Sequence, residues 1–150
     1  MTFDDLIARC EAAGHKFEFF GPQDDDKIDE LEASLGVALP PSFRAFLRRY
    51  GGGGITGDWI SGIYKGQPLL RQAGTVYGDT LRFREQCKLP PHLVVIYSQD
   101  DEVVWCLDTA KRRQDGENPI VSFDVDARSL PLPVADSFGG FFTDYLEMHS

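Results

Sequence analysis

The stretch LEASLGVALPPSFRAFLRRYGGGG, residues 31–54, predicts two helices joined by a proline turn. Leu31 and Leu35 lie one helical turn apart on an apolar stripe, and Gly36 is suited to end that first helix. Two consecutive prolines then prevent the first helix from continuing, and a proline fits the first turn of a new helix. We therefore expect a helical hairpin over this stretch.

The second helix of the hairpin has the stronger pattern. Its apolar residues recur at the spacing i, i+3, i+4, i+7, and they are Phe43, Phe46, Leu47 and Tyr50. Three arginines lie off that stripe, close to the end of the helix, where cations are favoured. The bounds that follow are residues 26–35 for the first helix and 41–50 for the second, with Leu39 packing back onto the core.

The four glycines after this helix raise the question of a phosphate-binding loop. A Walker loop needs Gly-Lys-Ser/Thr, whereas Ile55 and Thr56 follow the last glycine here. A dinucleotide fingerprint needs a strand before its glycines and a helix after them, and this sequence has the reverse order. The glycines are therefore interpreted as the end of a helix and a loop, and their extra length could open the rim of a cleft.

The rest of the chain predicts an α+β fold: one domain over residues 1–150, with a mostly antiparallel β-sheet packed against several helices. An amphipathic helix over residues 2–13 begins at a Thr2 cap, and a short helix begins at an Asp79 cap. A C-terminal helix is capped by Asp136 or Ser137. Segment 15–20 is expected to be extended, and strands are expected at 59–64, 93–98, 103–108 and 119–124.

Net charge is the bulk property that bears on function. The chain carries a formal charge of −9, and residues 24–32 hold six acids against one lysine. Nucleic-acid binding usually needs a basic stripe, so no direct nucleic-acid partner is expected. No apolar run approaches the ~20 residues of a membrane span, and the N-terminal stretch does not resemble a secretory signal. Three widely spaced cysteines do not suggest a disulfide framework, and a cytoplasmic location is expected.

No motif points to an active site, a cofactor or a metal. The cysteines form no Cys-x-x-Cys pair, the histidines lack ligand spacing, and no Gly-x-Ser-x-Gly elbow occurs. Asp100, Asp101 and Glu102 gather between two predicted strands, where a solvated hairpin tip is the common explanation. Asp100 and Asp101, together with Asp108, leave open a metal-dependent hydrolase as an alternative function.

The hairpin stretch resembles the SUKH superfamily, which joins a yeast cell-wall regulator of the Smi/Knr type to many bacterial immunity proteins. The matching residues are Ile28, Leu31, Glu32, Leu35, Gly36, Leu39, Pro40, Phe43, Phe46, Leu47, Tyr50, Gly51 and Gly52. VVWCLDT, GENPIV and ADSFGGFFTDYL resemble later motifs of the family in the same order. The resemblance covers about residues 24–146, with the helix over 2–13 as an addition.

The resemblance implies a noncatalytic protein-binding module, either an immunity protein that neutralises a cognate toxin, such as a nuclease, or a regulatory adaptor. A basic toxin would suit an acidic chain, because opposite charge speeds association. The candidate partner-binding residues are two acidic groups and two aromatic anchors: Asp24, Asp25, Asp26, Asp29 and Glu30; Asp100, Asp101 and Glu102; and Trp59 and Tyr64. Both acidic groups are expected to face solvent.

Overall fold

The computed structural model describes residues 2–98, 102–126 and 131–150. Its helices are α1 (Phe3–Ala12), α2 (Asp25–Leu35), α3 (Pro41–Arg49), α4 (Val76–Cys87) and α5 (Phe138–Glu147). Its strands are β1 (Phe17–Phe19), β2 (Gly53–Ile55), β3 (Asp58–Ile60), β4 (Leu93–Ser98), β5 (Val103–Asp108), β6 (Ile120–Asp124) and β7 (Leu132–Ala135). Neighbouring strands pair antiparallel in the order β1 to β7, which confirms the predicted α+β class.

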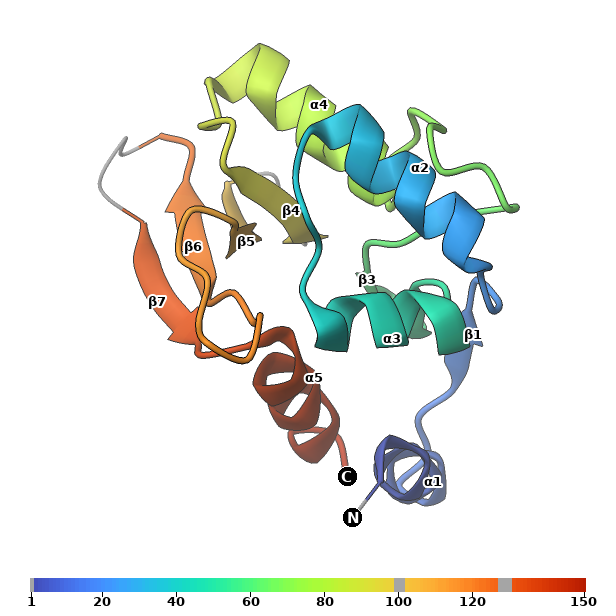
Figure 1. Ribbon diagram of the computed structural model, residues 1–150. Helices are drawn as coiled ribbons and strands as arrows, with labels where there is room; N and C mark the ends of the chain where they lie inside the picture. The colour runs from blue at the N-terminus through green and yellow to red at the C-terminus, as the bar shows by residue number, and fades with distance from the viewer. Residues whose placement is uncertain (1, 99–101, 127–130) are drawn as a thin grey trace.

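Helices cover both faces of the sheet (Figure 1). Alternate residues of a strand point to opposite faces. On β5, Val104 and Cys106 pack in the smaller core cluster with Phe83 of α4, whereas Leu107 packs in the larger cluster with α1, α2, α3 and α5. The central strands are therefore buried on both sides, and β1 and β7 form the two edges of the sheet.

The predicted helical hairpin is confirmed, with bounds that differ by one residue at two ends. Gly36 ends α2 with a left-handed φ of 70°, a conformation that glycine adopts without steric penalty. Phe43 and Phe46 are buried, and both rings contact Phe138 of α5 at centroid distances of 4.8 and 5.0 Å. The hairpin is thus held by a shared aromatic core with the C-terminal helix.

The interpretation of the glycine run as helix end plus loop was only half right. α3 does end just before the run, but Gly53 and Gly54 belong to strand β2 and pair with β1 and β3. A Cβ on Gly54, whose φ is 140°, would lie 2.6 Å from the Tyr145 hydroxyl oxygen. The glycines therefore let backbones and an aromatic side chain approach closely, and all four are buried rather than open to a cleft.

The helix cap predicted at Asp79 was wrong. Thr75 caps α4 instead, and its hydroxyl accepts a hydrogen bond from the backbone N–H of Gly78 (3.0 Å). Asp79 lies in the first turn, where its buried carboxylate accepts hydrogen bonds from the Ser61 hydroxyl (2.7 Å) and from the Gly74 N–H. This carboxylate therefore links the first turn of α4 to the residue that follows β3 and to the loop before α4.

Two strand predictions also differ from the structure. The strand expected at 59–64 is only β3, and the chain beyond it makes isolated bridges at Gly62 and Tyr64. β7 was not predicted, because Pro133 lies inside it and proline lacks the N–H that a strand needs. An edge strand tolerates that loss, since one of its sides has no neighbour. By contrast, the cap at Ser137 and the capping box at Thr2 are confirmed.

Candidate functional site

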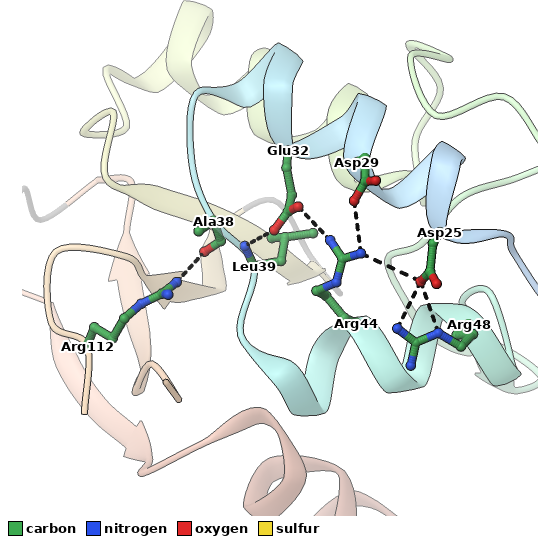
Figure 2. A network of polar contacts seen from close by, with 8 residues as sticks. All are labelled: Asp25, Asp29, Glu32, Ala38, Leu39, Arg44, Arg48 and Arg112. Carbon is green, nitrogen blue, oxygen red and sulfur yellow. Dashed lines mark hydrogen bonds and ion pairs between the residues drawn. The ribbon is translucent and has the colours of Figure 1, made fainter. Parts of the chain in front are cut away.

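The first acidic group lies along the exposed side of α2, as expected, but two of its members are held by α3. Arg44 reaches between the helices to the Asp29 carboxylate (2.9 Å) and lies 3.6 Å from Asp25. Arg48 donates two hydrogen bonds to Asp25, at 2.8 and 3.0 Å. Figure 2 shows both guanidinium groups pointing from α3 toward the carboxylates of α2. These acids hold the hairpin together.

Glu32 completes this network in a more buried position. Its carboxylate accepts hydrogen bonds from Arg44 (2.5 Å) and from the backbone N–H of Leu39 (2.6 Å), which fixes the turn between the helices (Figure 2). The side chains of Arg44 and Glu32 are 21% and 20% exposed. Burial lowers the pKa of Arg44, but interactions with Asp29 and Glu32 outweigh it, so that the net pKa is raised.

The hairpin is consequently less acidic than its first helix suggests. Residues 24–49 contain six carboxylates and four cations, which gives a net charge of −2. Asp24, Asp26 and Glu30 are exposed, and their carboxylates have no ion-pair partner within the described parts of the chain. These three carboxylates are the members of the first group that stay available to a partner.

The two candidate aromatic anchors lie close together, joined by a ring that the sequence analysis did not single out. Phe20 makes edge-to-face contacts with Trp59 (centroids 5.6 Å) and with Tyr64 (5.1 Å). Trp59 is 40% exposed, and the other Phe, Tyr and Trp side chains of the described residues are partly or fully buried. The segment containing Phe20 was predicted to be extended, but an extended segment does not reveal which strands will lie beside it.

Two shallow grooves lie near the candidate residues, and Trp59 lines the first of them. The first groove has a volume of about 330 Å³ and is lined by residues that include Trp59, Asp79 and Ser98. Burial raises the pKa of the Asp79 carboxyl, while its hydrogen bonds and the nearby Arg82 act in the opposite direction. The other groove lies between Lys27 and Glu30 of α2 and the loop of residues 66–71.

The second acidic group is only partly described. Asp100 and Asp101 lie outside the described residues, and Glu102 is exposed at the start of the segment that leads into β5. Asp108, the third carboxylate of the hydrolase alternative, is buried at the far end of β5, where it accepts a hydrogen bond from the Ala110 N–H (3.2 Å). Glu102 therefore lies just before the six-residue strand β5, and Asp108 is the last residue of that strand.

Metal-binding side chains do not converge in the described part of the molecule. Within residues 2–98, 102–126 and 131–150, no group of three or more His, Cys, Asp or Glu side chains could hold a metal ion. All three cysteines are free thiols, two of them buried. Among the helices of these segments, none combines the length and the hydropathy of a membrane span.

The architecture defines an α+β domain in which five described helices pack on a seven-stranded antiparallel sheet. A family model described as SUKH_5, SMI1-KNR4 cell-wall, matches residues 3–147, and the chain belongs to this family. The resemblance seen in the sequence is thereby confirmed, and the matched region includes α1. Membership supports a SMI1/KNR4-like or immunity-protein domain, a class of generally noncatalytic modules associated with partner proteins.

Proposed function

We propose that this protein is a cytoplasmic immunity protein that binds a cognate toxin domain of basic charge and masks it without catalysis. Family membership and the net charge of −9 support this function. The observation that carries it is the exposed Trp59, whose ring is held edge-to-face by Phe20. Exposed aromatic side chains held in place by neighbours are typical of binding hot spots.

The proposed partner surface comprises Phe20, Asp24, Asp26, Glu30, Trp59, Tyr64 and Glu102. Its parts are linked along the chain and by grooves: residues 21–24 connect Phe20 to the start of α2, and one groove lies between Glu30 and residues 66–71, which follow Tyr64. A second groove joins Trp59 to Ser98 at the end of β4, next to the hairpin that carries Glu102. A single protein partner could therefore contact both acidic groups and both anchors.

The acids and the aromatic rings are expected to act on different steps of binding. Exposed carboxylates steer a basic partner and raise the association rate, and they add little to the strength of the final complex. Burying the Trp59 ring in a partner pocket would slow dissociation, because hot-spot side chains mainly set the dissociation rate. The two contributions can be separated by kinetics at two salt concentrations.

The test begins with capture from the native host, using wild type, Trp59→Ala and Leu132→Ala as baits. Leu132 is a matched control, because it is 65% exposed but lies on β7, at the other edge of the sheet from β1. A captured protein that stops growth when expressed alone and is neutralised by this protein would support immunity. Loss of capture by Trp59→Ala, with Leu132→Ala unaffected, would place the binding at the partner surface.

Other outcomes argue against the proposal. A partner that is harmless when expressed alone would favour the regulatory adaptor. Equal capture by the two variants would move the binding to another face. Neutralising Asp24, Asp26 and Glu30 together should slow association and flatten its salt dependence, because these carboxylates have no ion-pair partners within the described residues to compensate. An unchanged association rate would contradict the steering role.

A further inference from the structure

A further cavity, which shares no lining residue with the two grooves, lies between α5 and the face of the sheet that α5 covers. Its volume is about 240 Å³, and its lining is mostly apolar. The side chains used below are Asp58, Tyr97, Trp105, Phe141, Asp144 and Tyr145, and we call this space the α5 cavity. An apolar cavity of roughly 150 Å³ already accommodates benzene, so the α5 cavity has room for a small organic group.

Aromatic rings form the walls of this cavity. Trp105 lies 5.0 Å from Tyr97 and 5.6 Å from Phe141, between ring centroids, and Tyr97 lies 5.9 Å from Phe141. Trp105 and Tyr97 remain partly exposed although both pack against the main core. Because the rings stand this close together, a group in the cavity can lie within the ~6 Å at which a cation is attracted to more than one ring.

The polar side of the cavity is anionic and rigidly held. The Asp58 carboxylate accepts a hydrogen bond from the Tyr97 hydroxyl, and its side chain is 21% exposed. The buried Tyr145 hydroxyl donates to the Asp58 carbonyl oxygen (2.5 Å) and accepts from the Ile55 N–H (2.9 Å), which fixes the backbone beneath the carboxylate. These bonds hold Asp58 at the cavity in one position.

A second carboxylate and the local composition add to this charge. Asp144, on the exposed side of α5, has no side-chain partner within the part of the chain that the structure describes. Residues 131–150 contain three acids and neither lysine nor arginine. The basic side chain in the cavity lining is His149, whose Nε2 lies 3.9 Å from the Asp58 carboxylate.

We propose that the α5 cavity binds an organic ammonium group, whether on a free small molecule or at the end of a lysine side chain. Aromatic faces attract a cation through their quadrupole and also bury its methyl or methylene groups, which water solvates poorly. The carboxylates of Asp58 and Asp144 supply the opposite charge at the mouth. A neutral group of the same shape gains the apolar contact alone, so the charge should decide affinity.

The first experiment uses Trp59→Phe, which leaves Trp105 as the only tryptophan, because the chain has two. Choline, its neutral isostere 3,3-dimethylbutan-1-ol and Nα-acetyl-lysine methylamide are titrated while Trp105 fluorescence is recorded. Choline should give a saturable change with a Kd about tenfold lower than that of the isostere. Saturation by the lysine amide as well would assign the site to a protein side chain, and saturation by choline alone would assign it to a free ammonium compound.

A matched pair of variants then tests the carboxylate. Asp144→Asn and Glu147→Gln each remove one exposed negative charge from α5, but Glu147 does not line the cavity. Calorimetry should show choline binding weakened about two- to fivefold by Asp144→Asn and unchanged by Glu147→Gln. Equal binding of choline and its neutral isostere, an absence of saturable binding, or equal effects of the two substitutions would each overturn the proposal. None of these outcomes depends on a toxin partner.

Discussion

Replacing Arg44 by methionine tests whether α2 and α3 are held together by their charges or only by their apolar faces. The change keeps most of the aliphatic volume and removes the guanidinium that contacts Asp29 (2.9 Å) and Glu32 (2.5 Å). Hydrogen bonds to charged groups contribute about 1.5–3 kcal/mol each when they are shielded from water. Glu32 retains its bond from the Leu39 N–H, and both side chains are about one-fifth exposed, so solvent reduces the loss.

We expect Arg44→Met to lower the free energy of unfolding by about 2 kcal/mol. With a urea m-value of about 2 kcal/mol per molar, the unfolding midpoint should fall by about 1 M. Arg48→Met is the matched control: the same substitution one turn later removes a pair whose side chains are 52% and 60% exposed. That pair should contribute at most about 0.5 kcal/mol, and the contribution should decrease further in high salt.

The assay is urea unfolding of the three proteins, followed by far-UV circular dichroism. A double-mutant cycle with Glu32→Gln should give a coupling energy of about 1 kcal/mol to Arg44. If Arg44→Met and Arg48→Met shift the midpoint equally, then burial of the network has no energetic consequence. The hairpin would in that case be stabilised by its aromatic core alone.

Three further predictions concern close packing, proton binding and thiol reactivity. Gly54→Ala should destabilise the fold by about 2–3 kcal/mol, because its Cβ would meet the Tyr145 hydroxyl, whereas Gly57→Ala, with open space around it, should cost about 1 kcal/mol in urea melts. Because the pKa of Asp79 is raised, the folded state binds the proton more tightly than the unfolded state does. The free energy of unfolding of wild type should therefore fall relative to that of Asp79→Asn as pH rises above 3.8, the ordinary pKa of the carboxyl group. A difference between the two proteins that stays constant with pH would contradict this. Cys87, which is partly exposed, should react with a thiol reagent in the native protein well before the two buried cysteines, as mass spectrometry of timed samples would show.

Much of the fold could be predicted because its signals are local. Strands at 93–98 and 103–108 were predicted with the bounds that the structure has, since β-branched and aromatic residues are concentrated there. The α2–α3 hairpin follows from one apolar stripe on each helix and two prolines between them. In these segments the residues that select the local conformation are also those that face the core.

The features that were not predicted depend on contacts between distant segments. Gly54 looked like part of a helix end, because nothing near it in sequence shows that Tyr145 will approach from α5. Asp79 looked like a cap, and its partner Ser61 lies eighteen residues earlier. The prolines around β7 argue against a strand unless the strand is known to be an edge.

The candidate partner surface was predictable by residue type but not by role. Exposure of the acids follows from their helical spacing on α2, and the structure confirms that they face solvent. Which of them remain unpaired could not be predicted, because that depends on how α3 packs beside α2 and where Arg44 and Arg48 then point. The α5 cavity likewise could not be predicted from the sequence, since its walls come from four strands and one helix.

The packing of α1 against α5 has a consequence for the order of folding. The ends of the described chain lie together (Figure 1), where the Phe3 ring meets the Phe142 ring at 4.8 Å and the Cys10 thiol donates to the Leu146 carbonyl oxygen (3.1 Å). Strands β4 to β7 pair with their neighbours in sequence, so those pairings close short loops, whereas docking of α1 on α5 closes nearly the whole chain. We therefore expect the β4–β7 part of the sheet to be formed in the folding transition state and the two terminal helices to dock after it. Phe3→Leu should then speed unfolding and leave the folding rate unchanged in stopped-flow chevron measurements, and a slowed folding limb would show instead that the chain closes early.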